Sequence, residues 1–324
     1  MNEAILQVRR LQVRFGARTA VRDVSFDLFD GESLGLVGES GSGKSTLARA
    51  ILRLVRAANG SVMWRGQDLL ACDTTSLRRL RRDLQIVFQD PLASLSPRMT
   101  AREIIAEPLR IFEASLNAGQ IQRRVDSMLE RVGLTSALGG RLPHEFSGGQ
   151  CQRIGIARAM VITPQCLICD EPVSSLDVSI QGQIVNLLLD LQRDAQTAML
   201  FISHNLAIVR HVCHRVMVMY AGLLVEVAPR DALFATPIHP YTVALVAAVP
   251  ALMPHPRAAT SRMPAPSPFV ESAGLGAGQG CAYRGRCVHA VAVCGTTVPP
   301  LEEAAPGHWV ACHRAKEFPL SLPA

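Results

Sequence analysis

The sequence predicts an α/β fold with a parallel central sheet, and three observations indicate it. Beyond residue 165, strand-like apolar runs alternate with amphipathic helical patterns, which is typical of parallel sheets covered by helices. The apolar run Ser33–Val37 leads directly into a Gly-rich turn and then into helix-favouring residues. Between about residues 90 and 163, helical patterns occur without strand signals, so we expect a helical subdomain there.

The elements are predicted in chain order. Short β runs at Ala4–Phe15, Val21–Leu28 and Ser61–Gly66 indicate an antiparallel layer beside the core. Helices are predicted over Thr100–Ile111 and Gln120–Val132. The alternation then resumes with a helix at Ser179–Arg193, a strand at Thr197–Ile202, a short helix near Leu206, and strands at Val216–Tyr220 and Leu223–Val227.

Length and hydropathy limit the class of protein. At 324 residues the chain is long enough for one large domain with an appendage. It is 48% hydrophobic, yet no run of about 18 to 20 residues is free of charges and helix breakers, so no membrane-spanning helix is expected. Its start lacks a basic segment before a long apolar core, so no secretory signal is expected. We therefore expect a soluble protein in the cytosol.

The net charge of +6 and the isoelectric point near 9.0 permit an anionic partner, either nucleic acid or lipid. The dense basic cluster has no interleaved aromatic residues for base stacking, and it consists of Arg78, Arg79, Arg81 and Arg82. A solvated helix face is the interpretation that we favour, and no nucleic-acid partner is expected.

The Gly-rich turn after Ser33–Val37 has the spacing of a phosphate-binding loop, G-x-x-x-x-G-K-S. Glycines let backbone N–H groups turn toward a phosphate, and the following helix points its positive end at the same anion. Lys44 is placed to reach the β- and γ-phosphate oxygens, and the Ser45 hydroxyl to bind Mg²⁺. The residues predicted to bind the nucleotide here are Gly38, Ser40, Gly41, Gly43, Lys44, Ser45 and Thr46.

A second predicted strand, beginning at Gln165, ends in two acids, Asp170 and Glu171. The end of such a strand would emerge beside the phosphate loop. Asp170 is then expected to hold Mg²⁺, and Glu171 to face the attacking water. This arrangement would separate metal binding from base chemistry.

The segment Ser147–Gln150 is a further candidate site. Ser147 is predicted to cap a helix, and Gly148 and Gly149 leave the amides of the helix start uncovered, so the segment could bind an anion. Two γ-phosphate binders about a hundred residues apart indicate that they meet on different copies of the chain, across a two-fold axis. A serine-capped helix without a ligand explains the local sequence equally well.

Two further polar residues follow predicted strands. Gln89 comes after the strand Leu84–Phe88 and could sense Mg²⁺ or water, whereas His204 follows Thr197–Ile202 and could contact a γ-phosphate. Each residue is ordinary when taken alone. Their order along the chain with the other segments makes them candidates, because each coincidental explanation would have to hold independently.

The order phosphate loop, Gln, SGGQ, Asp-Glu, Asp177, His resembles the nucleotide-binding subunit of ATP-binding cassette (ABC) transporters over essentially the whole chain. The resemblance implies a P-loop NTPase fold with a RecA-like core, an antiparallel β layer and a helical subdomain, acting on ATP with Mg²⁺ bound by Ser45, Gln89 and Asp170. The further roles that it implies are Walker A at Gly38–Thr46, a Q-loop at Gln89, the signature at Ser147, Gly148, Gly149 and Gln150, Walker B at Leu167–Asp170, catalytic Glu171 assisted by Lys44, a D-loop at Ser174–Asp177, a switch His204, and a ring under adenine at Phe15. A core position for Phe15 is the alternative interpretation.

Longer stretches at Val87–Met99, Pro143–Arg158 and Pro237–Leu245 resemble the F-type ATP-binding subunits of oligopeptide and dipeptide importers. This resemblance implies ATP-driven peptide import at the cytoplasmic side of the inner membrane, as a peripheral protein. The partners that it implies are a second ABC ATPase subunit, identical or paralogous, two membrane permeases and, through them, an extracytoplasmic substrate-binding protein. Import of nickel or another small solute, or a non-transport ABC ATPase acting on nucleic acid, remain alternatives.

The composition divides the chain into three regions: an ATPase domain over residues 1–249, a connector over 250–280 and a Cys-rich extension over 281–324. The connector is rich in Pro, Ala, Gly and Ser and has no periodicity. The helical subdomain is expected at about residues 90–163 of the first region.

The extension contains four cysteines, Cys281, Cys287, Cys294 and Cys312. Disulfides are disfavoured in a reducing cytosol and so short a tail has little core, so we expect the thiolates to share one metal centre. Zinc prefers C-x-x-C pairs, which are absent here, and similar tails in the peptide-importer branch imply a 4Fe–4S cluster, which we favour over zinc. Unligated cysteines are the third alternative.

Overall fold

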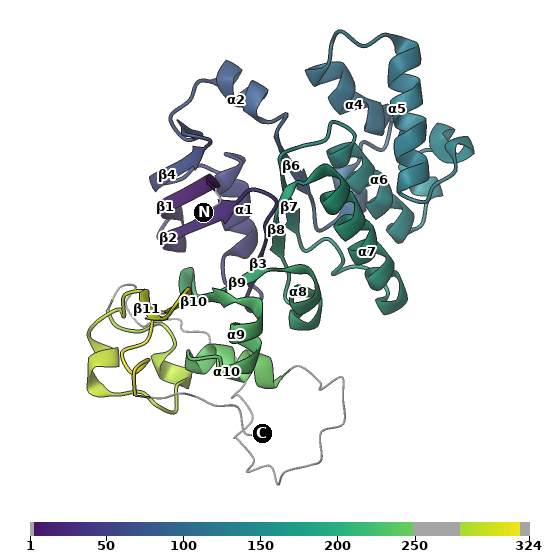
Figure 1. Ribbon diagram of the computed structural model, residues 1–324. Coiled ribbons are helices and arrows are strands. Elements are labelled where there is room, and N and C mark those ends of the chain that lie inside the picture. Colours follow the sequence, from purple (N-terminus) through teal and green to yellow (C-terminus); the bar gives the residue numbers. More distant parts are fainter. Residues whose placement is uncertain (1–2, 249–278, 318–324) are drawn as a thin grey trace.

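Five parallel strands form one side of the main sheet, and a parallel α/β sheet is what the sequence predicts. The structure, a computed structural model, describes residues 3–248 and 279–317 (Figure 1). Across the sheet the parallel strands lie in the order β9 Arg215–Tyr220, β3 Ser33–Val37, β8 Ala198–Ile202, β7 Cys166–Asp170 and β6 Leu84–Val87. Three antiparallel strands continue the sheet beyond β9, in the order β10 Leu223–Pro229, β12 His308–Val310 and β11 Glu302–Ala305.

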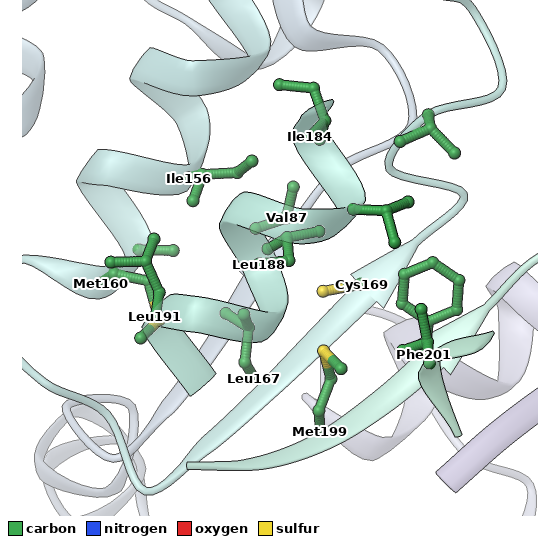
Figure 2. Packing of buried hydrophobic residues seen from close by; sticks show 14 of the residues in the cluster. Val87, Ile156, Met160, Leu167, Cys169, Ile184, Leu188, Leu191, Met199 and Phe201 are labelled. Carbon is green, nitrogen blue, oxygen red and sulfur yellow. The ribbon is translucent and has the colours of Figure 1, made fainter. Parts of the chain in front are cut away.

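The parallel strands are covered on both faces, which explains their continuous apolar runs. Alternate residues of β7 enter different cores: Leu167 and Cys169 pack beneath the helices α6 Gly148–Met160 and α7 Val178–Ala195, whereas Cys166 and Ile168 belong to the core on the opposite face. Figure 2 shows Leu188 of α7 above Leu167 and Cys169.

The opposite face of the main sheet is covered by an antiparallel sheet and the helix α1 Lys44–Ile51. The second sheet has the strand order β2-β1-β4-β5. The strand β1 Ala4–Phe15 alternates buried and more exposed residues along much of its length, as expected for a strand with one face in a core. The bounds of these strands are β1 Ala4–Phe15, β2 Arg18–Phe29, β4 Asn59–Trp64 and β5 Gln67–Asp68.

The interval between β6 and β7 is helical, which confirms the prediction. Its main helices are fixed at their starts by reciprocal capping bonds, as between Thr100 and Glu103. Both predicted helices are present with ends that differ by one or two residues. The elements are α3 Pro91–Ser94, α4 Ala101–Phe112, α5 Ala118–Arg131, η1 Ser136–Gly140, η2 Pro143–Glu145 and then α6.

The remaining α-helices of the described residues lie between strands or follow β10. The arginine cluster falls in and just after α2 Thr74–Leu80. The others are α8 Leu206–Val212, α9 Arg230–Ala235 and α10 Pro240–Ala247. Within the two described ranges, no helix combines the length and the apolarity needed to cross a membrane.

The described part of the extension adds two strands to the main sheet, which the sequence did not predict. It begins with the short helices η3 Arg284–Arg286 and η4 Ala292–Gly295, and then β12 pairs with β10 beside α9 and α10 (Figure 1). Glu226 of β10 is fully buried and accepts hydrogen bonds from the N–H groups of Ile238 and His239, while His308 Nε2 lies 2.6 Å from Glu226 Oε1. The extension is therefore packed on the core. The predicted connector 250–280 lies outside the described residues, apart from its last two.

Candidate active site

The predicted phosphate loop lies between β3 and α1, where the backbone itself requires two of its glycines. Gly38 has φ 153°, and a Cβ there would lie 2.2 Å from the Met219 carbonyl oxygen. Gly43 has φ 107°, and a Cβ there would lie 2.4 Å from the Ala20 carbonyl oxygen. Any side chain at either position would push the loop away from neighbouring strands.

Lys44 is buried with its ammonium folded back over the loop. Lys44 Nζ donates to the carbonyl oxygens of Gly38 at 2.8 Å and Glu39 at 2.9 Å, and it lies 3.9 Å from Glu171 Oε1. Burial lowers the pKa of Lys44, while the charges of Glu171 and Asp170 oppose that shift. The site thus holds a buried cation whose partners are two neutral carbonyls and a carboxylate at longer range.

Asp170 and Ser45 meet beside the loop. Ser45 Oγ donates to Asp170 Oδ1 at 2.7 Å, whereas Asp170 Oδ2 is buried and has no hydrogen-bond partner within the described ranges. The guanidinium of Arg49 lies 3.9 Å from that second oxygen. Burial raises the pKa of Asp170, with the Ser45 hydrogen bond and Arg49 acting in the opposite direction. A buried carboxylate oxygen without a partner, next to a hydroxyl, fits a hard cation such as Mg²⁺.

Glu171 is the residue at which the predicted catalytic groups converge. It has φ 48°, and its N–H donates to the Ile202 carbonyl at the end of β8. Its Oε2 lies 3.1 Å from His204 Nδ1 and accepts a longer hydrogen bond from Gln89 Nε2 at 3.5 Å. With Lys44 near the other oxygen, the structure brings all four residues together. Such a carboxylate can accept a proton from water at the mouth of the loop.

The segment Ser147–Gln150 lies elsewhere. Ser147 Oγ accepts from the Gln150 N–H, and the Gln150 side chain accepts from the Ser147 N–H, so the predicted capping role is confirmed. Among the described residues, no hydrogen bond or ion pair joins this segment to residues 38–46. A Cβ on Gly149 would lie 2.9 Å from the Ile180 side chain, so the segment packs on the start of α7. Its meeting with the loop on another copy stays a prediction.

Two other predicted contacts lie at the surface. Phe15 ends β1 with 52% of its surface exposed, so the core interpretation of this ring is wrong. Ala20, on the strand paired with β1, approaches the phosphate loop at Gly43, which places this end of the hairpin beside the loop. Asp177 is exposed at the start of α7. Neither the adenine contact of Phe15 nor the role of Asp177 is tested by the single chain.

The four cysteines of the extension line one cavity, but they do not form a ready-made metal site. Cys281, Cys287, Cys294 and Cys312 surround it together with other residues of the extension and of α10. As placed, the described residues contain no group of three or more His, Cys, Asp or Glu that could hold a metal ion. The predicted iron–sulfur or zinc centre is therefore not supported by a preformed site. Burial raises the pKa of Cys281, Cys287 and Cys312.

Two contacts to the phosphate loop were missed by the sequence reasoning. The Tyr241 hydroxyl accepts from the Glu39 N–H at 2.9 Å, and Arg286 Nη1 donates to both carboxylate oxygens of Glu39 at 3.0 Å. Tyr241 lies in the stretch Pro237–Leu245 that resembles the peptide-importer branch. That stretch was the available signal for Tyr241, whereas nothing in the local sequence points to Arg286.

Comparison with known proteins agrees with this geometry. Residues 21–174 match the ABC transporter family, and residues 225–294 match the C-terminal region of oligopeptide/dipeptide transporters. The oligopeptide transport ATP-binding protein OppF of Haemophilus influenzae is 45% identical over 96% of this chain and 97% of its own length. OppF of Salmonella typhimurium is 50% identical over 90% of this chain and 87% of its own length.

The chain belongs to the ABC transporter family.

A solved ABC structure supports the fold as well. The ATP-binding cassette MJ0796, described as a dimer in a post-hydrolysis state with ADP and phosphate, aligns with a TM-score of 0.63 at 26% identity. The alignment covers 69% of this chain and 98% of that one. The predicted ABC nucleotide-binding fold is thereby confirmed. The chain described here is therefore an ATPase, and its family implies that it uses ATP and Mg²⁺.

Proposed function

We propose that this chain is the ATP-hydrolysing subunit that powers oligopeptide import by an ABC transporter. The observation that carries the proposal is the convergence of Lys44, Ser45, Asp170 and Glu171 beside one phosphate loop. Peptide as cargo is supported by the relatives, which are named for oligopeptide transport, and by the match of residues 225–294.

The loop binds the nucleotide in this account. Backbone amides between Gly38 and Thr46 face the β- and γ-phosphates, and Lys44 exchanges its carbonyl partners for phosphate oxygens. Ser45, Asp170 and Gln89 are the residues that would hold Mg²⁺, which neutralises charge on the phosphates when bound. The partnerless oxygen of Asp170 supports its place in this set.

Hydrolysis requires a base and an oriented water. The water oxygen forms a bond to the γ-phosphorus, the bond from that phosphorus to the bridging oxygen of ADP breaks, and Glu171 accepts the water proton. His204, 3.1 Å from the carboxylate, orients it and faces the γ-phosphate, while Gln89 contacts the same carboxylate oxygen. Lys44 offsets the charge that develops on the leaving group.

A second ATPase subunit completes the site. We infer that Ser147, Gly148, Gly149 and Gln150 of one subunit cover the γ-phosphate on the other, with Asp177 at the shared seam and Phe15 stacked on adenine. The separation of Ser147–Gln150 from the loop within one chain supports this arrangement, as does the dimeric state of the related cassette. The second subunit is either a copy or a paralogue.

Two membrane permeases would receive the movement that ATP binding and hydrolysis produce in this subunit. The cassette over residues 1–249 would attach peripherally to them at the cytoplasmic side of the inner membrane, through the helical subdomain at about 90–163. Closure on ATP and opening after hydrolysis would move that subdomain and alternate the access of the permeases. An extracytoplasmic binding protein would deliver the peptide to the permeases.

The proposal also includes a metal centre on the four cysteines of the extension. We propose that Cys281, Cys287, Cys294 and Cys312, which line one cavity, would hold a 4Fe–4S cluster in preference to zinc once their thiolates move together, because as they lie they form no metal-binding group. Iron and zinc analysis of anaerobically purified protein tests this. Finding neither metal removes the hypothesis.

The experiment that tests the main proposal is uptake by the reconstituted transporter. The full chain is combined in proteoliposomes with its permeases, partner ATPase and binding protein, and entry of a labelled oligopeptide is followed with ATP on the chain's side. We expect ATP-dependent uptake, which Lys44→Ala lowers by at least tenfold. ATP hydrolysis without peptide uptake, but with uptake of nickel, would contradict the peptide assignment while leaving the ATPase intact.

A further inference from the structure

The carboxyl-terminal extension touches the phosphate loop directly. Arg286, the last residue of η3, lies 247 residues beyond Glu39 in the chain, yet its Nη1 donates to both Glu39 carboxylate oxygens at 3.0 Å. Both side chains are about one-third exposed, at 35% and 30%. Glu39 is the residue directly after Gly38, so this contact falls within the loop itself.

Glu39 is a point at which several restraints on the loop meet. Its N–H donates to the Tyr241 hydroxyl at 2.9 Å, its carbonyl accepts from Lys44 Nζ at 2.9 Å, and its carboxylate accepts from Arg286. Backbone and side chain of this one residue are therefore fixed by three different parts of the fold. Displacement of Glu39 would shift the carbonyl that positions Lys44.

Arg286 is itself held in place. Its guanidinium lies 5.7 Å from the ring centroid of Tyr283 and 6.0 Å from that of Tyr220. Tyr283 packs edge-on against Tyr220 and contacts Tyr241, so three rings from β9, α10 and the extension form one cluster beneath the loop. The residue after Arg286 is Cys287, which lines the cysteine cavity.

We propose that Arg286 is a positioning residue for the phosphate loop, through which the packing of the extension sets the affinity for ATP. The inference rests on the proposed function, because it concerns the same nucleotide site. By holding Glu39, Arg286 keeps Gly38 and Lys44 in the arrangement that receives the phosphates, so less ordering is needed on binding. Rearrangement around Cys287 would reach the loop through the same guanidinium.

The test compares steady-state ATP hydrolysis by the full-length chain in its assembled transporter. Because charge-assisted hydrogen bonds between partly exposed groups are of modest strength, Arg286→Ala should raise the KM for MgATP by about three- to tenfold. The kcat at saturating MgATP should change by less than about twofold, since Glu171 is untouched. Arg286→Lys, which keeps the charge, should recover part of the loss.

Two comparisons separate positioning from general damage. Arg284→Ala removes an arginine of the same turn whose guanidinium donates to the Gly295 carbonyl within the extension, and we expect its KM to stay near that of the wild type. Glu39→Gln combined with Arg286→Ala should raise KM no further than Arg286→Ala alone, because both remove the same contact.

An unchanged KM in Arg286→Ala, or an equal rise in Arg284→Ala, would overturn the proposal while the ATPase assignment stood. Additive effects of Glu39→Gln and Arg286→Ala would overturn it as well. Failure of the wild-type chain to bind or hydrolyse MgATP would instead refute the proposed function.

Discussion

Among single residues, Glu171 has the role that is easiest to isolate, because its neighbours bind it through geometry that glutamine can largely imitate. Glu171→Gln should lower kcat for ATP by about 10² to 10⁴, the contribution expected of a general base. The affinity for MgATP should remain within about threefold of wild type, since Lys44 and the loop are unchanged. Phosphate release and calorimetric titration measure the two quantities. Turnover at the wild-type rate would remove Glu171 as the base.

The burial of a second residue, His239, leads to a prediction of how the free energy of unfolding depends on pH. His239 is buried at the start of α10, and burial lowers its pKa to about 4, with Glu226 opposing the shift. The unfolded histidine, with a pKa near 6.5, binds a proton at higher pH than the folded one. The free energy of unfolding therefore falls as pH drops from about 6.5 toward 4, and this contribution is constant above that window.

His239→Asn separates that titration from the structural role of the side chain. His239 Nδ1 accepts the Tyr241 N–H, and asparagine can accept the same bond as a helix cap. Between pH 7 and pH 5, wild type should lose about 2 kcal/mol more unfolding free energy than the variant. Urea denaturation at both pH values measures this. Equal losses in both proteins would show that His239 does not titrate as its burial indicates.

At the scale of elements, one buried side-chain contact reinforces the pairing of β12 with β10. His308 lies against Glu226, whose remaining contacts are the N–H groups of Ile238 and His239. His308→Leu leaves the buried carboxylate with one donor fewer, so the free energy of unfolding should fall by about 2 kcal/mol. His308→Gln, which can still donate, should lose less. Chemical denaturation measures both variants, and a leucine variant as stable as wild type would count against this anchor.

Elements with strong local patterns could be predicted from the sequence, whereas short edge strands could not. The bounds of β1 and β3 agree with the prediction, because alternating or continuous apolar runs define them. In contrast, β11 reads Glu-Glu-Ala-Ala with all four residues exposed, and β12 has three residues. The segment β12 becomes a strand because β10 offers it an edge, and β11 then pairs with β12, so both strands depend on tertiary structure.

For the molecule as a whole, the site also divides into residues that the local sequence predicts and residues that only the tertiary fold brings in. The loop residues and the two acids at the end of β7 were predictable because each group is fixed by its own strand end. Tyr241 and Arg286 were not, since they reach Glu39 from 202 and 247 residues away. The pairing of phosphate loop and signature segment is a property of two subunits, and the single chain leaves it as a prediction.

The most direct test of the central claim is ATP-dependent association of the Glu171→Gln chain, measured by sedimentation velocity alone and with its partner ATPase subunit. We predict that ATP converts it from monomer to dimer. Adding Ser147→Asp keeps the helix cap but places a negative charge against the γ-phosphate, so this double variant should still bind ATP yet remain monomeric. Dimerisation that occurs without ATP, or that Ser147→Asp leaves intact, would contradict an ATP molecule clamped between two subunits.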